Sequence, residues 1–169
     1  MILATDVLYT DGKGIAAGIL FENWESCSPV GEYVSETDVD EAYIPGQFYK
    51  RELPCILRLL HEHALSPETI IVDGYVFLDG VAQPGLGKYL YDALGGRQTI
   101  VGVAKNVFSG ISSMHGILRG RSHKPLYITV IGDSLDAAKA NVLSMCGEHR
   151  IPVLLKRADR LCRESSGTW

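Results

Sequence analysis

The sequence has no long apolar run. No uninterrupted stretch approaches the ~20 apolar residues that a membrane-spanning helix needs. Residues 1–6 contain no basic residue and already reach Asp6, which is untypical of a secretory signal peptide. We therefore predict a cytoplasmic protein without membrane contact, and we favour a monomer.

Cysteine motifs are missing as well. The four cysteines are scattered, without a C-x-x-C pair; they are Cys27, Cys55, Cys146 and Cys162. This pattern argues against a zinc site and against a disulfide framework. We expect these side chains to be small, buried or half-buried apolar residues.

Positive charge is scarce, because 16 Lys and Arg stand against 20 Asp and Glu and give a net charge of −4. Bulk attraction to nucleic acid is therefore disfavoured, and a polyphosphate ligand requires a local basic patch or a bound cation. One candidate patch consists of Arg119, Arg121, His123 and Lys124. A second basic cluster, at 156–163, is equally typical of a solvated amphipathic helix.

What is present is the composition of one ordinary globular domain, with 169 residues, 46% hydrophobic and 21% charged. Two apolar runs, 2–9 and 14–22, flank Asp11-Gly12, a strong signal of a β-hairpin. A third strand is predicted at 30–36. A helix follows within 47–65, and its regular part is expected to begin near Leu53 because Pro54 suits a first turn.

The rest of the chain alternates strands with helices. The strands are predicted at 69–73, 98–103 and 125–131. The helices are predicted at 85–94, 135–147 (with Ser134 as N-cap) and 153–164. The Gly-, Ser- and basic-rich residues 106–124 are expected to form a mobile flap or hairpin. The fold class is therefore α/β, a single domain over 1–169 with a mixed sheet and helices on both faces.

Three carboxylates occupy positions that draw attention. Asp6 lies inside the first apolar strand, Asp73 ends a buried strand, and Glu52 starts the first helix. Acids so placed can converge into the hard oxygen ligands that Mg²⁺ or Mn²⁺ requires. Each also has an ordinary explanation: a strand Asp paired with a basic side chain, a turn Asp before Gly, or a first-turn acid favoured by the helix dipole.

Six segments, which follow the family's order along the chain, resemble the endonuclease V family, enzymes that nick nucleic acid near deaminated adenine. The two most specific are Tyr43-Ile44-Pro45-Gly46 followed by Arg51-Glu52, and Val101-Gly102-Val103-Ala104-Lys105. The others are Thr5-Asp6-Val7 (with Tyr9), Ile71-Val72-Asp73-Gly74, Lys124-Pro125-Leu126-Tyr127-Ile128 and Arg157-Ala158-Asp159-Arg160. The likeness spans nearly the whole chain.

The resemblance implies a ribonuclease H-like fold around a metal centre. Asp6 and Asp73 are then ligands of Mg²⁺, with Mn²⁺ as a substitute, and Glu52 holds the metal or its waters. Lys105 lies near the scissile phosphate. The resemblance also implies a wedge that enters the duplex and glycines that let the backbone approach the flipped base. The wedge residues are Tyr43, Ile44 and Pro45, and the glycines are Gly46 and Gly74.

The family pattern is incomplete in this sequence. Ala42 replaces a Pro, Tyr75-Val76 replace x-Gly after Asp73-Gly74, and Gln83 replaces a His before Pro; the family's N-terminal segment is also expected to be missing. The late Gly-His-Arg reads Gly132-Asp133-Ser134, so the histidine is absent and Asp133 is a candidate substitute ligand. These changes indicate a retained metal centre with an altered base pocket.

We predict a Mg²⁺-dependent endonuclease that hydrolyses the phosphodiester bond 3′ to inosine or deoxyinosine, in DNA repair or RNA processing. Its partner is DNA or RNA, with Arg119, Arg121 and Lys124 holding backbone phosphates. The alternative is a respecialised or non-catalytic homologue that binds other lesions or branched nucleic acid. A phosphate loop at 80–88 is disfavoured, because Leu86 and Tyr89 stand where that motif requires Lys and Ser or Thr.

Overall fold

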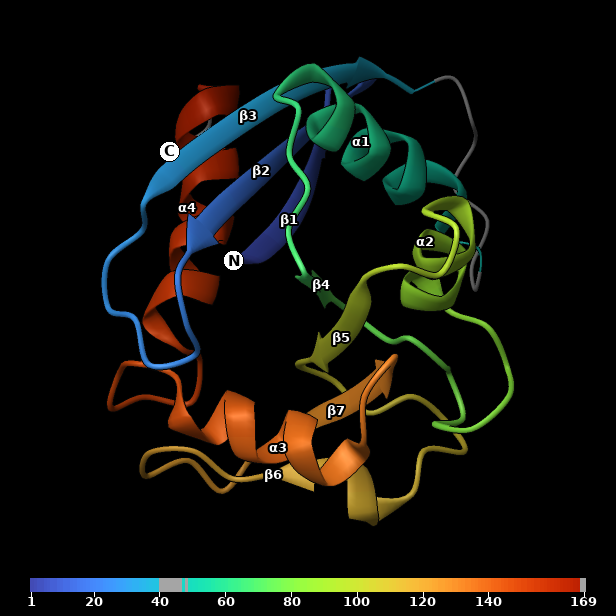
Figure 1. Cartoon of the computed structure of the whole chain (residues 1–169), viewed down its shortest axis with the longest axis vertical. Coiled ribbons are helices and arrows are strands. Elements are labelled where there is room, and N and C mark those ends of the chain that lie inside the picture. Colours follow the sequence, from blue (N-terminus) through green and yellow to red (C-terminus); the bar gives the residue numbers. More distant parts are fainter. Residues whose placement is uncertain (40–46, 48, 168–169) are drawn as a thin grey trace.

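The computed structural model describes residues 1–39, 47 and 49–167, and a seven-stranded mixed sheet forms its centre (Figure 1). The strands are β1 (Ile2–Thr10), β2 (Lys13–Phe21), β3 (Gly31–Asp38), β4 (Thr69–Asp73), β5 (Thr99–Ala104), β6 (Gly116–Ile117) and β7 (Leu126–Ile131). They are arranged in the order β3-β2-β1-β4-β5-β7-β6. β1, β4 and β5 are parallel, whereas the other neighbouring pairs are antiparallel. The predicted combination of an antiparallel meander with parallel strands is confirmed.

The predicted hairpin connects β1 and β2. Asp11 and Gly12 take φ angles of 50° and 75°, and Thr10 pairs with Lys13 across the turn. Two central residues at positive φ match the right-handed twist of the strands, which is why Asp-Gly favours this connection. β3 then pairs antiparallel with β2 and completes the meander.

In the part of the chain that the structure describes, four helices cover the two faces of the sheet (Figure 1). α1 (Tyr49–Glu62) and α2 (Leu86–Ala93) pack on one face, and α3 (Leu135–Ser144) and α4 (Val153–Ser166) pack on the other. Ile70 and Ile71 are adjacent on β4, yet Ile70 packs with α1 and α2 and Ile71 packs with α3 and α4. Both faces are buried, so this strand reads as a continuous apolar run. Among the described residues, no helix is long and apolar enough to cross a membrane.

The start of α1 differs from the prediction. The helix begins at Tyr49, so Pro54 lies in its interior and not in its first turn. An interior proline costs about 3 kcal/mol because it removes one N–H donor and crowds the preceding turn. Burial of the α1 side chains Ile56, Leu59 and Leu60 contributes about 1.5–3 kcal/mol each. The apolar face of α1 therefore outweighs the proline.

For the segment at 106–124 the sequence predicts a mobile flap or a hairpin. This segment contains a 3₁₀ turn, η1 (Ser113–His115), and β6, which pairs antiparallel with β7. His115 is buried, and its Nδ1 lies 2.9 Å from the carbonyl oxygen of Ile128. Of the two predicted alternatives, a hairpin with β7 is the one observed.

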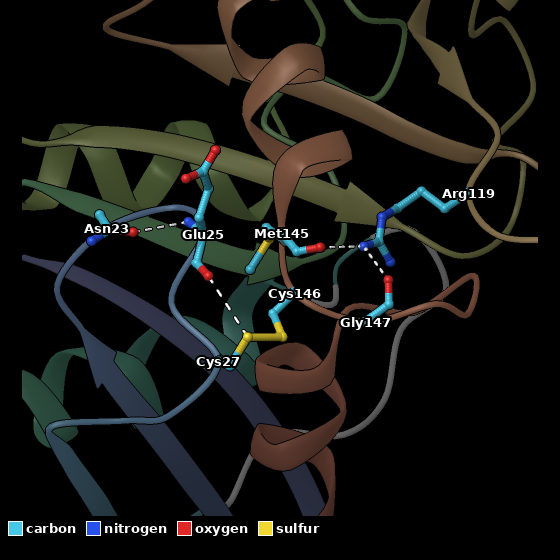
Figure 2. Close-up of a disulfide and its surroundings, with 7 residues drawn as sticks. All are labelled: Asn23, Glu25, Cys27, Arg119, Met145, Cys146 and Gly147. Atoms are coloured by element: carbon cyan, nitrogen blue, oxygen red, sulfur yellow. Dashed lines mark hydrogen bonds between the residues drawn. A yellow bond between two sulfur atoms is a disulfide. The ribbon is translucent and has the colours of Figure 1, made fainter.

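A disulfide joins Cys27, in the β2–β3 connection, to Cys146, just after α3 (Figure 2). The prediction that the cysteines form no disulfide is therefore wrong for this pair. The two residues are 119 positions apart and meet only because the β2–β3 connection packs beside the end of α3, which no local spacing reveals. Cys55 and Cys162 are free and buried, as predicted.

Candidate active site

Two of the predicted acids lie on neighbouring parallel strands. β1 pairs with β4 from Ile2 opposite Thr69 to Ala4 opposite Ile71, and continuing this register by two residues sets Asp6 beside Asp73. Side chains two residues apart on a strand share a face, so both acids emerge on the face of Ala4 and Ile71, which α4 covers. The pair therefore lies at the C-terminal end of β4, the edge where α/β sheets place their sites.

Lys105 joins this pair from the next strand. It follows Val103 by two residues, and Val103 is opposite Asp73 in the β4–β5 register. Its Nζ lies 3.2 Å from Asp73 Oδ2. The pKa of the ammonium is raised even though burial acts to lower it, because Asp73, Asp6 and Asp159 surround it. Lys105 is thus a cation held among carboxylates.

Glu52 approaches the same acids from α1. Burial, reinforced by the charges of Asp73 and Asp6, raises its pKa to about 8. Burial, reinforced by Asp73 and opposed by Lys105, raises the pKa of Asp6 to about 7. Ionisation of both acids is therefore disfavoured in the absence of a further positive charge, and an added cation would favour the ionised carboxylates.

A fourth carboxylate, Asp159 on α4, was not among the predicted site residues. Its charge raises the pKa of both Asp6 and Lys105, so it acts on the same cluster. It accepts a hydrogen bond from Arg163 Nε at 3.2 Å. The sequence did carry a signal: Asp159 is in the last family-like segment and is one helical turn beyond Leu155, which lines the site.

Two cavities meet at the cluster. The smaller, about 20 Å³, is on the α4 side and holds about one water-sized sphere; its lining includes Asp6, Asp73, Lys105, Ile151 and Leu155. The larger, about 390 Å³, is within the range of small-molecule pockets. Its lining includes Tyr49, Glu52, Asp73, Gly74, Tyr75, Leu78, Leu86, Lys105, Asn106 and Phe108. Asp73 and Lys105 line both and thus connect an ion-sized space to a ring-sized one.

Tyr75 shapes the larger cavity. Its hydroxyl donates to the carbonyl oxygen of Asn106 at 2.6 Å and accepts from the Phe108 N–H at 3.1 Å. Tyr75 therefore ties the segment after β5 to the β4–α2 connection. The departure from the family pattern after Asp73-Gly74, where Tyr75 stands, therefore alters the wall of this cavity.

The residues fit a divalent cation in chemistry and charge. They offer carboxylate oxygens, the ligands that Mg²⁺ prefers. Within the described part of the chain, no three His, Cys, Asp or Glu side chains are close enough together to hold an ion as they stand. Asp73 instead forms an ion pair with Lys105. The Lys105 ammonium therefore lies beside the carboxylate that would also bind a cation.

Asp133 is far from this cluster, which corrects the prediction that it is a metal ligand. β7 is antiparallel to β5, and Ile131 pairs with Ile100, so the end of β7 lies at the opposite edge of the sheet. Asp133 is exposed there and accepts a hydrogen bond from the Ser134 N–H at 2.7 Å.

Arg119 is a structural residue, which corrects its predicted role as a phosphate contact. Its side chain is buried. The guanidinium donates to the carbonyl oxygens of Met145 at 2.6 Å, Gly147 at 3.3 Å and His149 at 2.7 Å, and Figure 2 shows the first two bonds. It is therefore not available to a backbone phosphate.

Gly74, also a predicted nucleic-acid contact, lines the larger cavity. The remaining predicted contacts divide into two groups. Arg121 and Lys124 are exposed, and Lys124 Nζ lies 3.3 Å from Oδ1 of Asn106, a residue of the larger cavity. The predicted wedge, Tyr43-Ile44-Pro45 with Gly46, lies outside the described residues.

Residues 1–118 match the sequence profile of the family described as Endonuclease V. Endonuclease V of Streptomyces avermitilis is 32% identical over an alignment of 189 positions. The alignment covers 97% of this chain and 80% of the relative. A crystal structure of endonuclease V from that organism matches with a TM-score of 0.81 at 28% identity, covering 98% of this chain and 81% of the other.

Two more distant solved structures share the fold. Human endonuclease V matches with a TM-score of 0.76 at 23% identity, covering 97% of this chain and 83% of the other. Endonuclease V of Ciona intestinalis, in complex with a 24mer DNA containing an inosine followed by a ribo-adenosine, gives a TM-score of 0.80 at 16% identity, covering 98% and 85%. The fold is thus ribonuclease H-like, and the family implies a divalent metal cofactor. A profile match over more than half of the chain, with a relative above 30% identity across nearly all of it, establishes that this protein belongs to the endonuclease V family.

Proposed function

We propose that this chain, acting as one domain and as a monomer, is a Mg²⁺-dependent endonuclease that hydrolyses the phosphodiester bond 3′ to inosine or deoxyinosine. One observation carries the proposal: Asp73 and Lys105 line both an ion-sized cavity and a neighbouring cavity of about 390 Å³. The inosine-containing DNA bound by the Ciona relative supports the choice of substrate.

Asp6, Asp73 and Glu52 would hold the cation, with Asp159 as a further carboxylate. Burial and mutual repulsion raise the pKa of Asp6 to about 7 and that of Glu52 to about 8, a cost that a divalent cation offsets. When bound, Mg²⁺ would supply Lewis-acid stabilisation of the charge that develops on the phosphate.

The protein's own groups would supply the rest of the chemistry. Lys105 would turn from Asp73 to a non-bridging phosphate oxygen and donate to it as a compact positive charge. Glu52, ionised in the loaded site, would accept a hydrogen bond from the attacking water and orient it. The resemblance to the family implies a 3′-hydroxyl and a 5′-phosphate as the products.

The larger cavity would take the base. Its lining combines aromatic and aliphatic side chains with the backbone at Gly74, which suits a flat ring turned out of the helix stack. Arg121 and Lys124 would contact backbone phosphates beside it. The wedge at Tyr43, Ile44 and Pro45, with Gly46, remains part of the proposal.

The test is cleavage of matched oligonucleotides, single- and double-stranded, DNA and RNA, each with and without one inosine, in Mg²⁺ and then Mn²⁺. We expect a cut 3′ to inosine that is lost in Asp73→Ala and kept in Asp133→Ala, an exposed acid at the other edge of the sheet. Failure to cut any of them, by folded protein that binds the metal, would instead favour the alternative of a homologue that binds other lesions or branched nucleic acid.

A cytoplasmic location is part of the proposal. Disulfides are rare in the reducing cytosol, so the state of the Cys27–Cys146 pair in cells bears on it. If the pair is reduced in that compartment, alkylation of thiols in freshly lysed cells would modify two more cysteines per chain than it does in the disulfide-bonded protein.

A further inference from the structure

Arg150 links three segments of the chain beside the site. It is half-buried, in the connection between α3 and α4. Its Nη2 donates to the carbonyl oxygen of Lys105 and, at 2.8 Å, to that of Pro125. Its Nε donates to the carbonyl oxygen of Lys124 at 3.0 Å. One guanidinium thus holds the backbone just after β5 against the backbone just before β7.

This contact begins where the sheet ends. The last β5–β7 pair is Ala104 with Tyr127, so Lys105 is one residue past the ladder. Pro125 has no N–H and cannot donate to the segment that leaves β5. Arg150 supplies there the hydrogen-bond donors that a neighbouring strand would otherwise provide. The next residue, Ile151, lines the small cavity with Asp6 and Asp73.

The connection that carries Arg150 is itself held in place. Arg119 donates to the carbonyl oxygens of Met145, Gly147 and His149 in this connection. The disulfide fixes Cys146 to Cys27 within the same stretch, and Figure 2 shows the disulfide with the Arg119 bonds to Met145 and Gly147. These hydrogen bonds and the disulfide therefore hold in place the connection from which Arg150 contacts Lys105.

We propose that Arg150 is a positioning residue for the reaction. Its guanidinium sets the backbone of Lys105, and through it the place of the ammonium between Asp73 and the scissile phosphate. The side chains that line the two cavities, as far as the structure describes them, do not include Arg150, so it acts through Lys105. The inference rests on the proposed function.

The expected effect follows from geometry. A misplacement of about 1 Å in a reacting group costs up to ~10²-fold in rate. Arg150→Lys keeps the charge, but a single ammonium lacks the planar fork that reaches several carbonyls. We expect Arg150→Lys and Arg150→Ala to lower kcat by about 10- to 100-fold with KM changed by less than about twofold.

A double-mutant cycle with Lys105 tests the route of this effect. If Arg150 acts through Lys105, Arg150→Ala causes no further loss of kcat in Lys105→Ala protein. The matched control is Arg97→Ala, which removes an exposed arginine just before β5, at the opposite edge of the sheet. Losses that multiply in the double variant, or a raised KM with unchanged kcat, would overturn the proposal in favour of an independent phosphate contact.

A second readout needs no cleavage and separates this inference from the proposed function. NMR of the metal-free protein reports the side-chain methylene signals of Lys105, assigned with Lys105→Arg. Arg150→Lys is expected to shift those signals, whereas Arg97→Lys is not. Shifts in a protein that cuts no substrate would refute the proposed function alone. Unchanged signals in a folded Arg150→Lys variant would refute the positioning role.

Discussion

The two edges of the sheet carry the same residue type in different environments. At the C-terminal edge of the parallel strands, Asp6 is half-buried beside Asp73, and its pKa is raised to about 7. At the opposite edge, Asp133 is exposed and accepts the Ser134 N–H at the start of α3. In the first environment the carboxylates repel one another, which a bound cation would relieve, and in the second a single acid lies at a helix start. Strand direction therefore decides which acids lie together at the proposed site.

The largest expected effect compares these two acids directly. Asp6→Asn is expected to lower the rate of cleavage 3′ to inosine by about 10³-fold or more, because it removes a proposed cation ligand and the proposed catalytic groups act together. Asp133→Asn is expected to leave the rate within about twofold, since its side chain is remote from the cluster. Initial rates at saturating Mg²⁺ measure both, and equal losses in the two variants would remove the distinction between the edges.

Sequence reasoning located what neighbouring residues encode. The placement of Asp6 inside one apolar strand, of Asp73 at the end of another and of Glu52 at a helix start predicted that these acids can converge. The position of Lys105 beside them was implied only by the family resemblance. Asp133 was misplaced because the antiparallel direction of β7 is set by pairing with β5, not by its own residues. The burial of Arg119, the Cys27–Cys146 contact and the approach of α4 with Asp159 depend on segments far apart in sequence.

Metal-free protein is expected to lose stability as the pH rises. The folded-state pKa values of Asp6 and Glu52, about 7 and about 8, lie above their ordinary values. Their stabilising contribution is thus fully present below those ordinary values and is lost as the pH rises through about 7 to 8. Thermal unfolding in EDTA at about pH 5 and about pH 8.5 measures the loss, which Mg²⁺ is expected to offset more at the higher pH. A Tm shift by Mg²⁺ that is equal at both pH values would contradict the assignment.

The disulfide is expected to stabilise the fold. Because the bond closes a loop across 119 positions, we expect Cys27→Ser with Cys146→Ser to lower the free energy of unfolding by about 2–4 kcal/mol. Urea denaturation of oxidised and reduced wild-type protein provides the comparison, and the double variant should match the reduced form. If reduction leaves the midpoint unchanged, the covalent link adds nothing to the stability of this region.

Arg119 and Lys124 allow a buried basic residue to be compared with an exposed one. Arg119→Ala is expected to cost about 2–4 kcal/mol of stability, because buried carbonyls lose their donor. Lys124→Ala is expected to leave stability within about 0.5 kcal/mol and to reduce the salt slope of nucleic-acid binding by about one. Denaturation curves and binding titrations at several salt concentrations test the pair, and a reduced slope in folded Arg119→Ala protein would restore its role as a phosphate contact.

The most direct test of the account is Mn²⁺ binding, measured by electron paramagnetic resonance on the wild-type protein and on Asp73→Asn and Asp133→Asn. The acids at the C-terminal edge are proposed to share one cation, so we expect Asp73→Asn to weaken binding about tenfold or more and Asp133→Asn to leave it unchanged. Equal affinity in all three proteins would show that Asp73 holds no metal, and the central claim would fail.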